Sequence, residues 1–562
     1  MAGVGLLGDP TSDRGAAASR GLAAGRPTIM IGTDPRVRPR STPVLVLVLV
    51  LVLVGLLASQ AVAQTPRIEV DDCPFLVIAP EVEGETIACG RLIVPENRAR
   101  PWGPTISLPF AIVGSHAAAP AEPIVYLEGG PGGSALMNVP DVWTRSALRQ
   151  HADIVVLDQR GTGYATPSLD CPEFLDDGVD DPLRACRDRL TAAGVDLAAY
   201  HSRESASDVA DLLEALDIEA ATLYGVSYGT RLALTVMRDH PERIVSVILD
   251  GVYPPHVNGY EDQAWNGFLA FEQLFDDCRA DAWCDAAYPD LRATFLAMVD
   301  TLDASPMLDD DGTAVTGADV VNDLFQLLYD TNALPYLPSI IAAAASGDID
   351  TWFDAQDRIP ADVHDDESDA YWNALDARLL LLTGLDDLDD LDAYLDTLDD
   401  ETYDALLAAA AGEVDGDAEG MFASVECTEE MPFNDLELAV AWAQDMPEQL
   451  RALIESVIDA FADCAIWDVP AADPMENEPV VSAIPTLLLS GAYDPVTPPW
   501  WGDEAAAYLP WSTHVVFPDM GHATVDIRPC PTQIALAFLA DPWTTPDTSC
   551  VDELGPPAFW VP

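Results

Sequence analysis

The sequence reads Gly225-Val226-Ser227-Tyr228-Gly229 near the middle of the chain, which matches the pattern G-x-S-x-G. The apolar residues 221–224 before it predict a short buried strand, and residues 230–240 after it predict an amphipathic helix. A serine between a strand and a helix lies on a tight, strained turn that exposes its hydroxyl at the end of a sheet. The flanking glycines fit such a turn, because side chains there would collide with the helix. This order of elements predicts that Ser227 is a nucleophile.

The regions on both sides of this turn alternate between apolar strands and helices. Uninterrupted apolar runs at 124–127, 154–157 and 245–249 predict buried strands, and residues 209–216 predict a helix with one apolar face. Such alternation indicates an α/β fold with a mostly parallel sheet that helices cover on both faces. Shorter strands are expected before this region, at 75–78, 91–94 and 106–110.

The pattern changes to helices rich in Ala, Leu and Asp between residues 253 and 479. Strand-like runs resume at 484–489 and 513–517, and a helix is expected over 532–539. The sequence therefore predicts a large helical cap (253–479) inserted into one sheet. Residues 64–252 would form the N-terminal part of the sheet domain, and residues 480–562 would form its C-terminal part.

A serine hydroxyl needs a base to act as a nucleophile at neutral pH, and the base needs an acid to orient it. In hydrolases of α/β architecture these groups follow in the order Ser, Asp, His. Only His514 and His522 come after the expected cap. His514 lies within an apolar strand, whereas His522 follows that strand in a loop from which its imidazole could reach the serine. We expect His522 to be the base.

Three aspartates compete for the orienting role. Asp494 follows the strand before His522, while Asp503 begins a helix and Asp519 crowds the histidine, so Asp494 is the expected acid. The developing oxyanion needs two backbone N–H groups. Tyr228 supplies one as the residue after the nucleophile, and Gly130 in the glycine-rich loop 129–133 is the expected second donor.

Four motifs in this order resemble the secreted tripeptidyl/prolyl aminopeptidase family of α/β-hydrolases, whose C-terminal region is TAP-like. The resemblance implies a serine exopeptidase that acts at free peptide N-termini. It also implies a carboxylate for the α-ammonium group, with Glu429 and Glu430 in the cap as first candidates and Glu128 as the next. Prolyl members carry a histidine where this chain has Glu128, so the resemblance leans toward the tripeptidyl branch. The motifs are Glu128-Gly129-Gly130-Pro131-Gly132-Gly133-Ser134, Asp158-Gln159-Arg160-Gly161-Thr162-Gly163, Gly225-Val226-Ser227-Tyr228-Gly229-Thr230 and Gly491-Ala492-Tyr493-Asp494-Pro495-Val496-Thr497-Pro498.

The charge composition narrows the function classes. The 562 residues include 95 acidic and 26 basic ones, a formal net charge of −69, and every basic residue is an arginine. This balance argues against nucleic-acid binding, because little here could neutralise a phosphate backbone. An acidic surface without lysine fits a protein that works in high salt, where counterions screen its self-repulsion. GC-rich coding, which favours arginine, is the alternative explanation.

The N-terminal region carries an export pattern. Arginines at 36, 38 and 40 precede an apolar run at 44–58, and Ala61-Val62-Ala63 follows as a cleavage site. Residues 1–63 are therefore expected to be a signal peptide region, and Met30 is a candidate start because the first 29 residues lack an apolar stretch. We expect a secreted protein, or one anchored at the cell surface if the apolar segment is not cleaved.

Ten cysteines fit export as well, because an even count in a secreted chain is typical of a disulfide framework. Sequential pairing is one connectivity among many, and we favour it because each pair then closes a local loop. No C-x-x-C, H-E-x-x-H or Cys/His cluster supports a metal site, and neither a metal nor a cofactor is expected. The expected pairs are Cys73 with Cys89, Cys171 with Cys186, Cys278 with Cys284, Cys427 with Cys464, and Cys530 with Cys550.

Two other functions remain open at this stage. A carboxylic-ester hydrolase could use the same three catalytic groups, since the fold does not determine the substrate. A catalytically idle protein of the same fold could serve as a binding protein, although Ser227, Asp494 and His522 would then have no physical reason to occur together. The sequence does not determine the oligomeric state.

Overall fold

The computed structural model describes residues 65–562, apart from residue 177, residues 309–311 and 361–368, and scattered positions between 384 and 416. The predicted signal peptide and the alternative start at Met30 lie outside the described residues. Within the described part, no helix is both long and apolar enough to cross a membrane. Residues Val62–Pro562 form one unit, and the description below concerns it.

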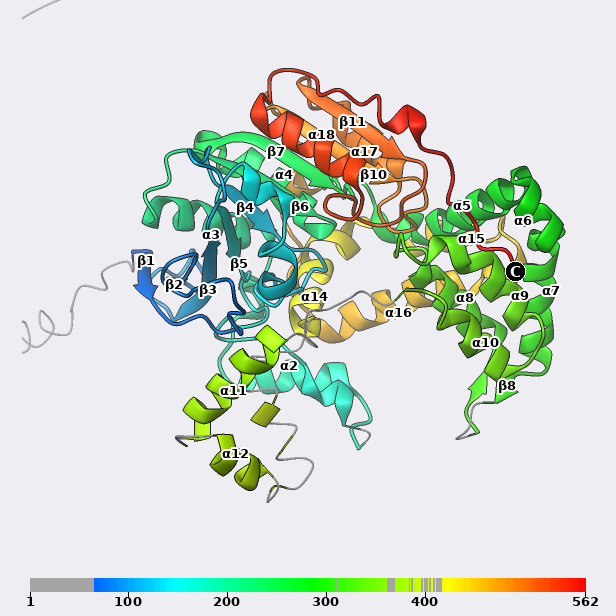
Figure 1. Ribbon diagram of the computed structural model, residues 1–562, viewed down its shortest axis with the longest axis horizontal. Helices are drawn as coiled ribbons and strands as arrows, with labels where there is room; N and C mark the ends of the chain where they lie inside the picture. Colours follow the sequence, from blue (N-terminus) through cyan, green and yellow to red (C-terminus); the bar gives the residue numbers. More distant parts are fainter. Residues whose placement is uncertain are drawn as a thin grey trace, which may run out of the picture. The chain divides into compact units, whose positions relative to one another are not determined.

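A nine-stranded sheet forms the framework of the molecule, in the order β1-β2-β3-β5-β4-β6-β7-β10-β11 (Figure 1). The first three strands and β5 pair antiparallel, and the pairs from β5 through β4, β6, β7 and β10 to β11 are all parallel. The strands are β1 (Arg67–Val70), β2 (Ile87–Pro95), β3 (Thr105–Val113), β4 (Ile124–Leu127), β5 (Ile154–Leu157), β6 (Ala221–Val226), β7 (Ile244–Asp250), β10 (Thr486–Gly491) and β11 (Ser512–Phe517).

Helices cover both faces of this sheet. Along β4, Ile124 and Tyr126 pack on the face covered by α18 (Pro529–Ala540), whereas Val125 and Leu127 pack on the face covered by α3 (Ser202–Ala215), α4 (Tyr228–Asp239) and α17 (Pro499–Ala506). Successive side chains of a strand point to opposite faces, so a strand buried on both sides must be apolar throughout. The α/β-hydrolase fold predicted from the apolar runs is confirmed.

A second group of helices lies in the sequence between β7 and β10, and most of them pack around an apolar core of their own. The range 253–479 for a cap domain stays a prediction, because the presence of helices does not show that this segment is a separate domain. The helices are α5 (Gly259–Ala280), α6 (Ala282–Ala287), α7 (Leu291–Ala304), α8 (Gly317–Leu327), α9 (Leu337–Ala344), α10 (Ile349–Gln356), α11 (Asp369–Thr383), α12 (Leu388–Leu395), α14 (Glu419–Val425), α15 (Leu436–Ala443) and α16 (Ala452–Trp467).

The strand expected at 75–78 is wrong. This segment has no regular structure, and its buried side chains Phe75 and Leu76 pack into two different apolar clusters. Its start is tied to β2 by the Cys73–Cys89 disulfide. The first strand is instead β1, which the sequence analysis did not single out because it has only four residues, most of them exposed.

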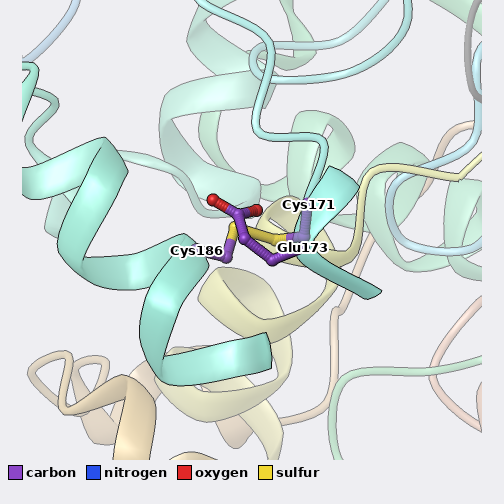
Figure 2. Close-up of side chains that lie close together, drawn as sticks. All are labelled: Cys171, Glu173 and Cys186. Atoms are coloured by element: carbon purple, nitrogen blue, oxygen red, sulfur yellow. A yellow bond between two sulfur atoms is a disulfide. The ribbon is translucent and has the colours of Figure 1, made fainter. Parts of the chain in front are cut away.

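All five expected disulfides are present, with the sequential pairing. Cys171 and Cys186 lie close to Glu173, a grouping that could hold a metal ion if the thiols were free. Figure 2 shows that the two sulfurs are bonded to each other. The Glu173 carboxylate is also occupied, because Arg189 donates to both of its oxygens at 2.5 and 3.1 Å.

Candidate active site

Ser227 occupies a strained turn between β6 and α4. Its backbone angles are φ 56° and ψ −127°, a conformation that a residue with a side chain adopts only where the surroundings impose it. A Cβ on Gly225 would lie 2.3 Å from the main-chain oxygen of Gly229, and a Cβ on Gly229 would lie 2.0 Å from that of Leu127. The two glycines are therefore required by close backbone approach, as the motif predicts.

The loop after β11 brings His522 to the carboxylate that follows β10. His522 Nδ1 lies 2.8 Å from Asp494 Oδ2 and 3.1 Å from Thr497 Oγ1. Since a carboxylate only accepts, Nδ1 carries the proton, and Nε2 is left with its lone pair free. The Asp494 carboxylate is 2 % exposed and also accepts the backbone N–H groups of Val496 and Thr497 at 2.9 and 2.8 Å. It is thereby fixed in position for orienting the imidazole.

The surroundings of His522 favour its charged form. Burial alone would lower its pKa, but the negative charge of Asp494 and the hydrogen bond to it outweigh burial and raise the pKa of His522 above its ordinary value. The Tyr329 ring lies edge-on to the imidazole at 5.2 Å between centroids, and the Tyr329 main-chain oxygen accepts the backbone N–H of His522 at 2.9 Å. An imidazolium formed at this position would be stabilised.

Asp250 at the end of β7 anchors the loop that carries His522. Its carboxylate accepts the backbone N–H groups of Thr524 and Val525, both at 2.9 Å, and the Thr524 hydroxyl at 2.9 Å. Its backbone oxygen accepts the Ser227 N–H at 2.9 Å. One buried residue therefore ties the serine turn and the histidine loop together, although it is not among the site residues predicted from the sequence.

The two alternative aspartates lie elsewhere. Asp503 Oδ1 is 2.9 Å from Nδ1 of His514, whose Nε2 faces the Ser490 hydroxyl at 3.1 Å, so this pair forms a separate contact. Asp519 has a buried Oδ1 with no hydrogen-bond partner among the described residues. Of the three aspartates weighed from the sequence, Asp494 is the one that contacts His522.

The glycine-rich loop after β4 lies against the serine. A Cβ on Gly129 would be 3.0 Å from Ser227 Cβ, and Gly130 borders the same cavity as Ser227. Within the described residues, the backbone N–H groups of Gly130 and Tyr228 make no hydrogen bond to the protein. This leaves both N–H groups without a protein acceptor, and their role as oxyanion donors stays a prediction.

Glu128 holds this loop in place. Its Oε1 accepts the Gly129 N–H at 2.8 Å and the Tyr126 hydroxyl at 3.0 Å, and its Oε2 accepts the Asn138 amide at 2.9 Å. Burial raises the pKa of Glu128. Its carboxylate is committed to these three donors, which favours a positioning role over contact with a substrate amine.

Comparisons with known proteins fit this geometry. A family model described as alpha/beta hydrolase fold matches residues 122–280, and one described as TAP-like protein matches residues 452–550. The chain is therefore similar to the TAP-like α/β-hydrolases over these two segments. Serine protease Hip1 of Mycobacterium tuberculosis (strain ATCC 25618 / H37Rv) is 24% identical over 471 residues, which cover 75% of this chain and 79% of that protein. Tripeptidyl aminopeptidase of Streptomyces coelicolor is 27% identical over 267 residues, which cover 41% of this chain and 47% of that protein. Proline iminopeptidase of Arabidopsis thaliana is 28% identical over 132 residues, which cover 24% of this chain and 27% of that protein.

This serine hydrolase has a cavity of about 480 Å³ in front of Ser227. That volume lies in the range of pockets that hold a drug-sized ligand. Aromatic side chains form much of its wall, and three carboxylates, Glu426, Asp459 and Asp463, also border it. The aromatic residues are Tyr253, Tyr260, Tyr329, Phe422 and Trp501.

The hydrolase buries the two glutamates proposed from the sequence for amine recognition, Glu429 and Glu430, against Arg231. Arg231 Nη1 lies 2.6 Å from Glu430 Oε2, and Arg231 Nε lies 3.5 Å from Glu429 Oε2. Glu430 also accepts the Gly259 N–H at 2.5 Å, and Glu429 accepts the Ser202 N–H. Both carboxylates thus have partners within the protein, and neither is among the described residues that border the cavity.

Glu426 is the glutamate of this turn that reaches the cavity. It begins a π-helical turn (Glu426–Glu430), and it is 5 % exposed. Burial, and next the negative charge of Glu430, raise the pKa of Glu426 to about 8. Asp463 on α16 borders the same cavity, and burial and the charge of Asp459 raise its pKa. Sequence reasoning missed both residues, although each one directly precedes a cysteine.

Those cysteines, Cys427 and Cys464, form a disulfide with a Cα–Cα distance of 5.1 Å. The bond therefore holds the π-helical turn and α16 together at the positions next to Glu426 and Asp463. We call these two residues the acidic pair. Within the described residues, no arginine or histidine lies within salt-bridge distance of either member.

One further group has the spacing of a metal site. Ligand atoms of His201, Glu429 and Glu476 lie within 4.8 Å of one another. Arg231 faces Glu429 at 3.5 Å and Arg203 faces Glu476 at 3.6 Å, so protein cations already compensate the two carboxylates. The group fits a buried ion-pair network better than an ion-binding site.

Proposed function

We propose that this hydrolase is an exported serine aminopeptidase that cleaves peptides from a free N-terminus, of the tripeptidyl or prolyl type. The observation that carries the proposal is the acidic pair, which faces the serine cavity without a cationic partner. An α-ammonium group is the cation that a peptide N-terminus would supply there. The names of the relatives and the disulfides, which are typical of oxidising compartments, support the proposal.

In the proposed mechanism, Ser227 attacks the scissile carbonyl while His522 Nε2 takes the hydroxyl proton. Asp494 holds the Nδ1 proton of His522 and stabilises the imidazolium. The N–H groups of Gly130 and Tyr228 bind the oxyanion of the tetrahedral intermediate. His522 then donates its proton to the leaving amine. A water molecule next attacks the acyl-Ser227 ester while His522 takes its proton, and His522 returns a proton to Ser227 as the acid product leaves.

The test compares four chromogenic substrates: an alanyl-alanyl-prolyl peptide, its N-acetylated form, a proline derivative and a short-chain ester. Wild type should cleave the free-amine peptides, not the acetylated one, and Ser227→Ala should cleave none. The better free-amine substrate assigns the branch. Ester cleavage alone would establish an ester hydrolase instead, and no cleavage of any substrate at low or high salt would favour a binding protein.

A second arm tests the acidic pair. A hydrogen bond to a charged group contributes about 1.5–3 kcal/mol, so Glu426→Gln should raise KM for the free-amine peptide roughly 10- to 100-fold. Glu448→Gln is the matched control, since Glu448 is an exposed glutamate whose carboxylate pairs with the neighbouring Arg451. Equal changes of KM in the two variants would show that Glu426 does not bind the amine.

A further inference from the structure

A second, smaller cavity of about 190 Å³ adjoins the serine cavity. The two share Tyr260, Phe422, Glu426, Ala460 and Asp463 as wall residues. Ser227 and Gly130 border only the larger cavity. The smaller one, which we call the distal compartment, therefore lies on the far side of the acidic pair from the nucleophile.

The walls that belong to the distal compartment alone are largely apolar. Leu183 of α2 (Pro182–Ala192), Ala423 of α14 and Met431 are buried, and Phe174 forms a half-exposed part of the wall. The Cys427–Cys464 disulfide contributes both of its residues. One carboxylate, Glu419, also borders the compartment, but it accepts the Cys171 N–H at 3.0 Å and is thereby occupied.

The junction between the two cavities constrains a bound peptide. If the acidic pair holds the α-ammonium group, the first Cα lies one bond from that nitrogen. The main chain must then run back through the larger cavity to Ser227. The side chain on the first Cα points in a different direction from the main chain. The space available to it, on the side of the acidic pair away from Ser227, is the distal compartment.

We propose that the distal compartment receives the side chain of the first substrate residue and selects peptides that begin with an apolar residue. The inference rests on the proposed function, because it needs the ammonium group at the acidic pair. One methylene in an apolar pocket changes specificity by roughly 10- to 200-fold. A leucine-first peptide should therefore exceed a glycine-first peptide in kcat/KM by at least about 10-fold, and an aspartate-first peptide should be among the poorest substrates.

The experiment varies only the first residue (Gly, Ala, Leu, Phe, Asp) of the free-amine peptide scaffold that wild type cleaves best. Ala423→Leu fills the compartment, and it should reduce the ratio of kcat/KM for leucine-first over glycine-first peptides to near one. Phe174→Ala opens the half-exposed wall to water and should also lower the ratio, and it keeps the test available if Ala423→Leu does not fold. Ala297→Leu adds the same bulk at an exposed position of α7 and should leave the ratio unchanged.

The outcomes separate this inference from the function on which it rests. A wild-type enzyme that requires a free amine but shows no preference between leucine-first and glycine-first peptides would overturn the distal compartment alone. A leucine preference that survives both Ala423→Leu and Phe174→Ala would overturn it as well. Equal cleavage of free and acetylated peptides would overturn the aminopeptidase itself, whatever the first residue.

Discussion

Removing the positive charge of Arg231 should destabilise the hydrolase severely. This guanidinium is 2 % exposed, and it faces two carboxylates, Glu429 and Glu430, that are 2 % and 1 % exposed. Its Nη1 binds Glu430 at 2.6 Å, its Nη2 donates to the Glu429 main-chain oxygen at 3.2 Å, and it lies 5.0 Å from the centre of the Tyr253 ring. Arg231→Met keeps the apolar stem and leaves two buried carboxylates without their cation.

Breaking a buried ion pair by removing one partner costs about 3–5 kcal/mol, because the remaining charge is left uncompensated. We expect Arg231→Met to lower the free energy of unfolding by this amount. Equilibrium urea unfolding measures it, followed by tryptophan fluorescence and far-UV circular dichroism, and the two transitions must coincide for the free energy to be defined. The matched control is Arg279→Met, which removes a 67 % exposed arginine paired with Asp276, and should cost less than about 1 kcal/mol.

A double variant separates lost charge compensation from lost packing. Adding Glu430→Gln to Arg231→Met removes one of the two uncompensated charges, so the double variant should be more stable than Arg231→Met alone. If Arg231→Met costs no more than Arg279→Met, the buried ion pairs do not hold the π-helical turn, and the reasoning fails. If Glu430→Gln lowers stability further in the Arg231→Met background, the loss is one of packing and not of charge.

Three other consequences can be measured directly. Asp494→Asn should lower kcat about 10⁴-fold with a smaller change in KM, because the imidazole loses the acceptor that selects its tautomer; a loss under tenfold in steady-state assays would assign the orienting role elsewhere. His522 must be neutral to act as a base, and Asp494 raises its pKa. The value of kcat/KM should therefore rise with pH through a midpoint above about 6.5. A midpoint below that value would contradict the effect of Asp494. Replacing Cys427 and Cys464 together with alanine should raise KM for the free-amine peptide more than for an ester, since the disulfide holds the acidic pair; equal effects on both substrates would limit the bond to a structural role.

Most of the fold could be predicted from hydrophobic pattern. Runs such as 124–127 and 154–157 are apolar throughout because both of their faces are buried, and the structure gives β4 and β5 those same bounds. The antiparallel edge was less accessible. β1 is only four residues long and mostly exposed, so its alternation of polar and apolar residues does not stand out. Residues 75–78 resemble a strand because burial next to a disulfide also selects apolar side chains.

Part of the candidate site could likewise be predicted from sequence, and part of it could not. The serine turn could be predicted from sequence because close backbone approach requires glycine at 225 and 229. The contact of His522 with Asp494 follows from where their strands end. Their catalytic roles stay predictions. The substrate carboxylates could not be chosen among 95 acidic residues, since a local run such as Cys427-Thr428-Glu429-Glu430 does not show which side chain turns toward a cavity.

The π-helical turn explains why the sequence around Cys427 does not show which glutamate borders the cavity. Glu426, Glu429 and Glu430 all lie in it and all are buried, and Arg231 lies within salt-bridge distance of Glu429 and Glu430. The third remains at the cavity wall without a protein cation, and the charge of Glu430 helps to raise its pKa to about 8. A substrate ammonium group bound beside Glu426 would supply the missing positive charge. It would also convert the carboxyl to its ionised form, so that binding near neutral pH releases a proton. Under the proposed function, the carboxylates that recognise the amine are those that border the cavity beyond salt-bridge distance of any described arginine or histidine. A proton should then be released when a free-amine peptide binds, but not when its acetylated form binds. Calorimetry in buffers of different ionisation enthalpy would detect this difference.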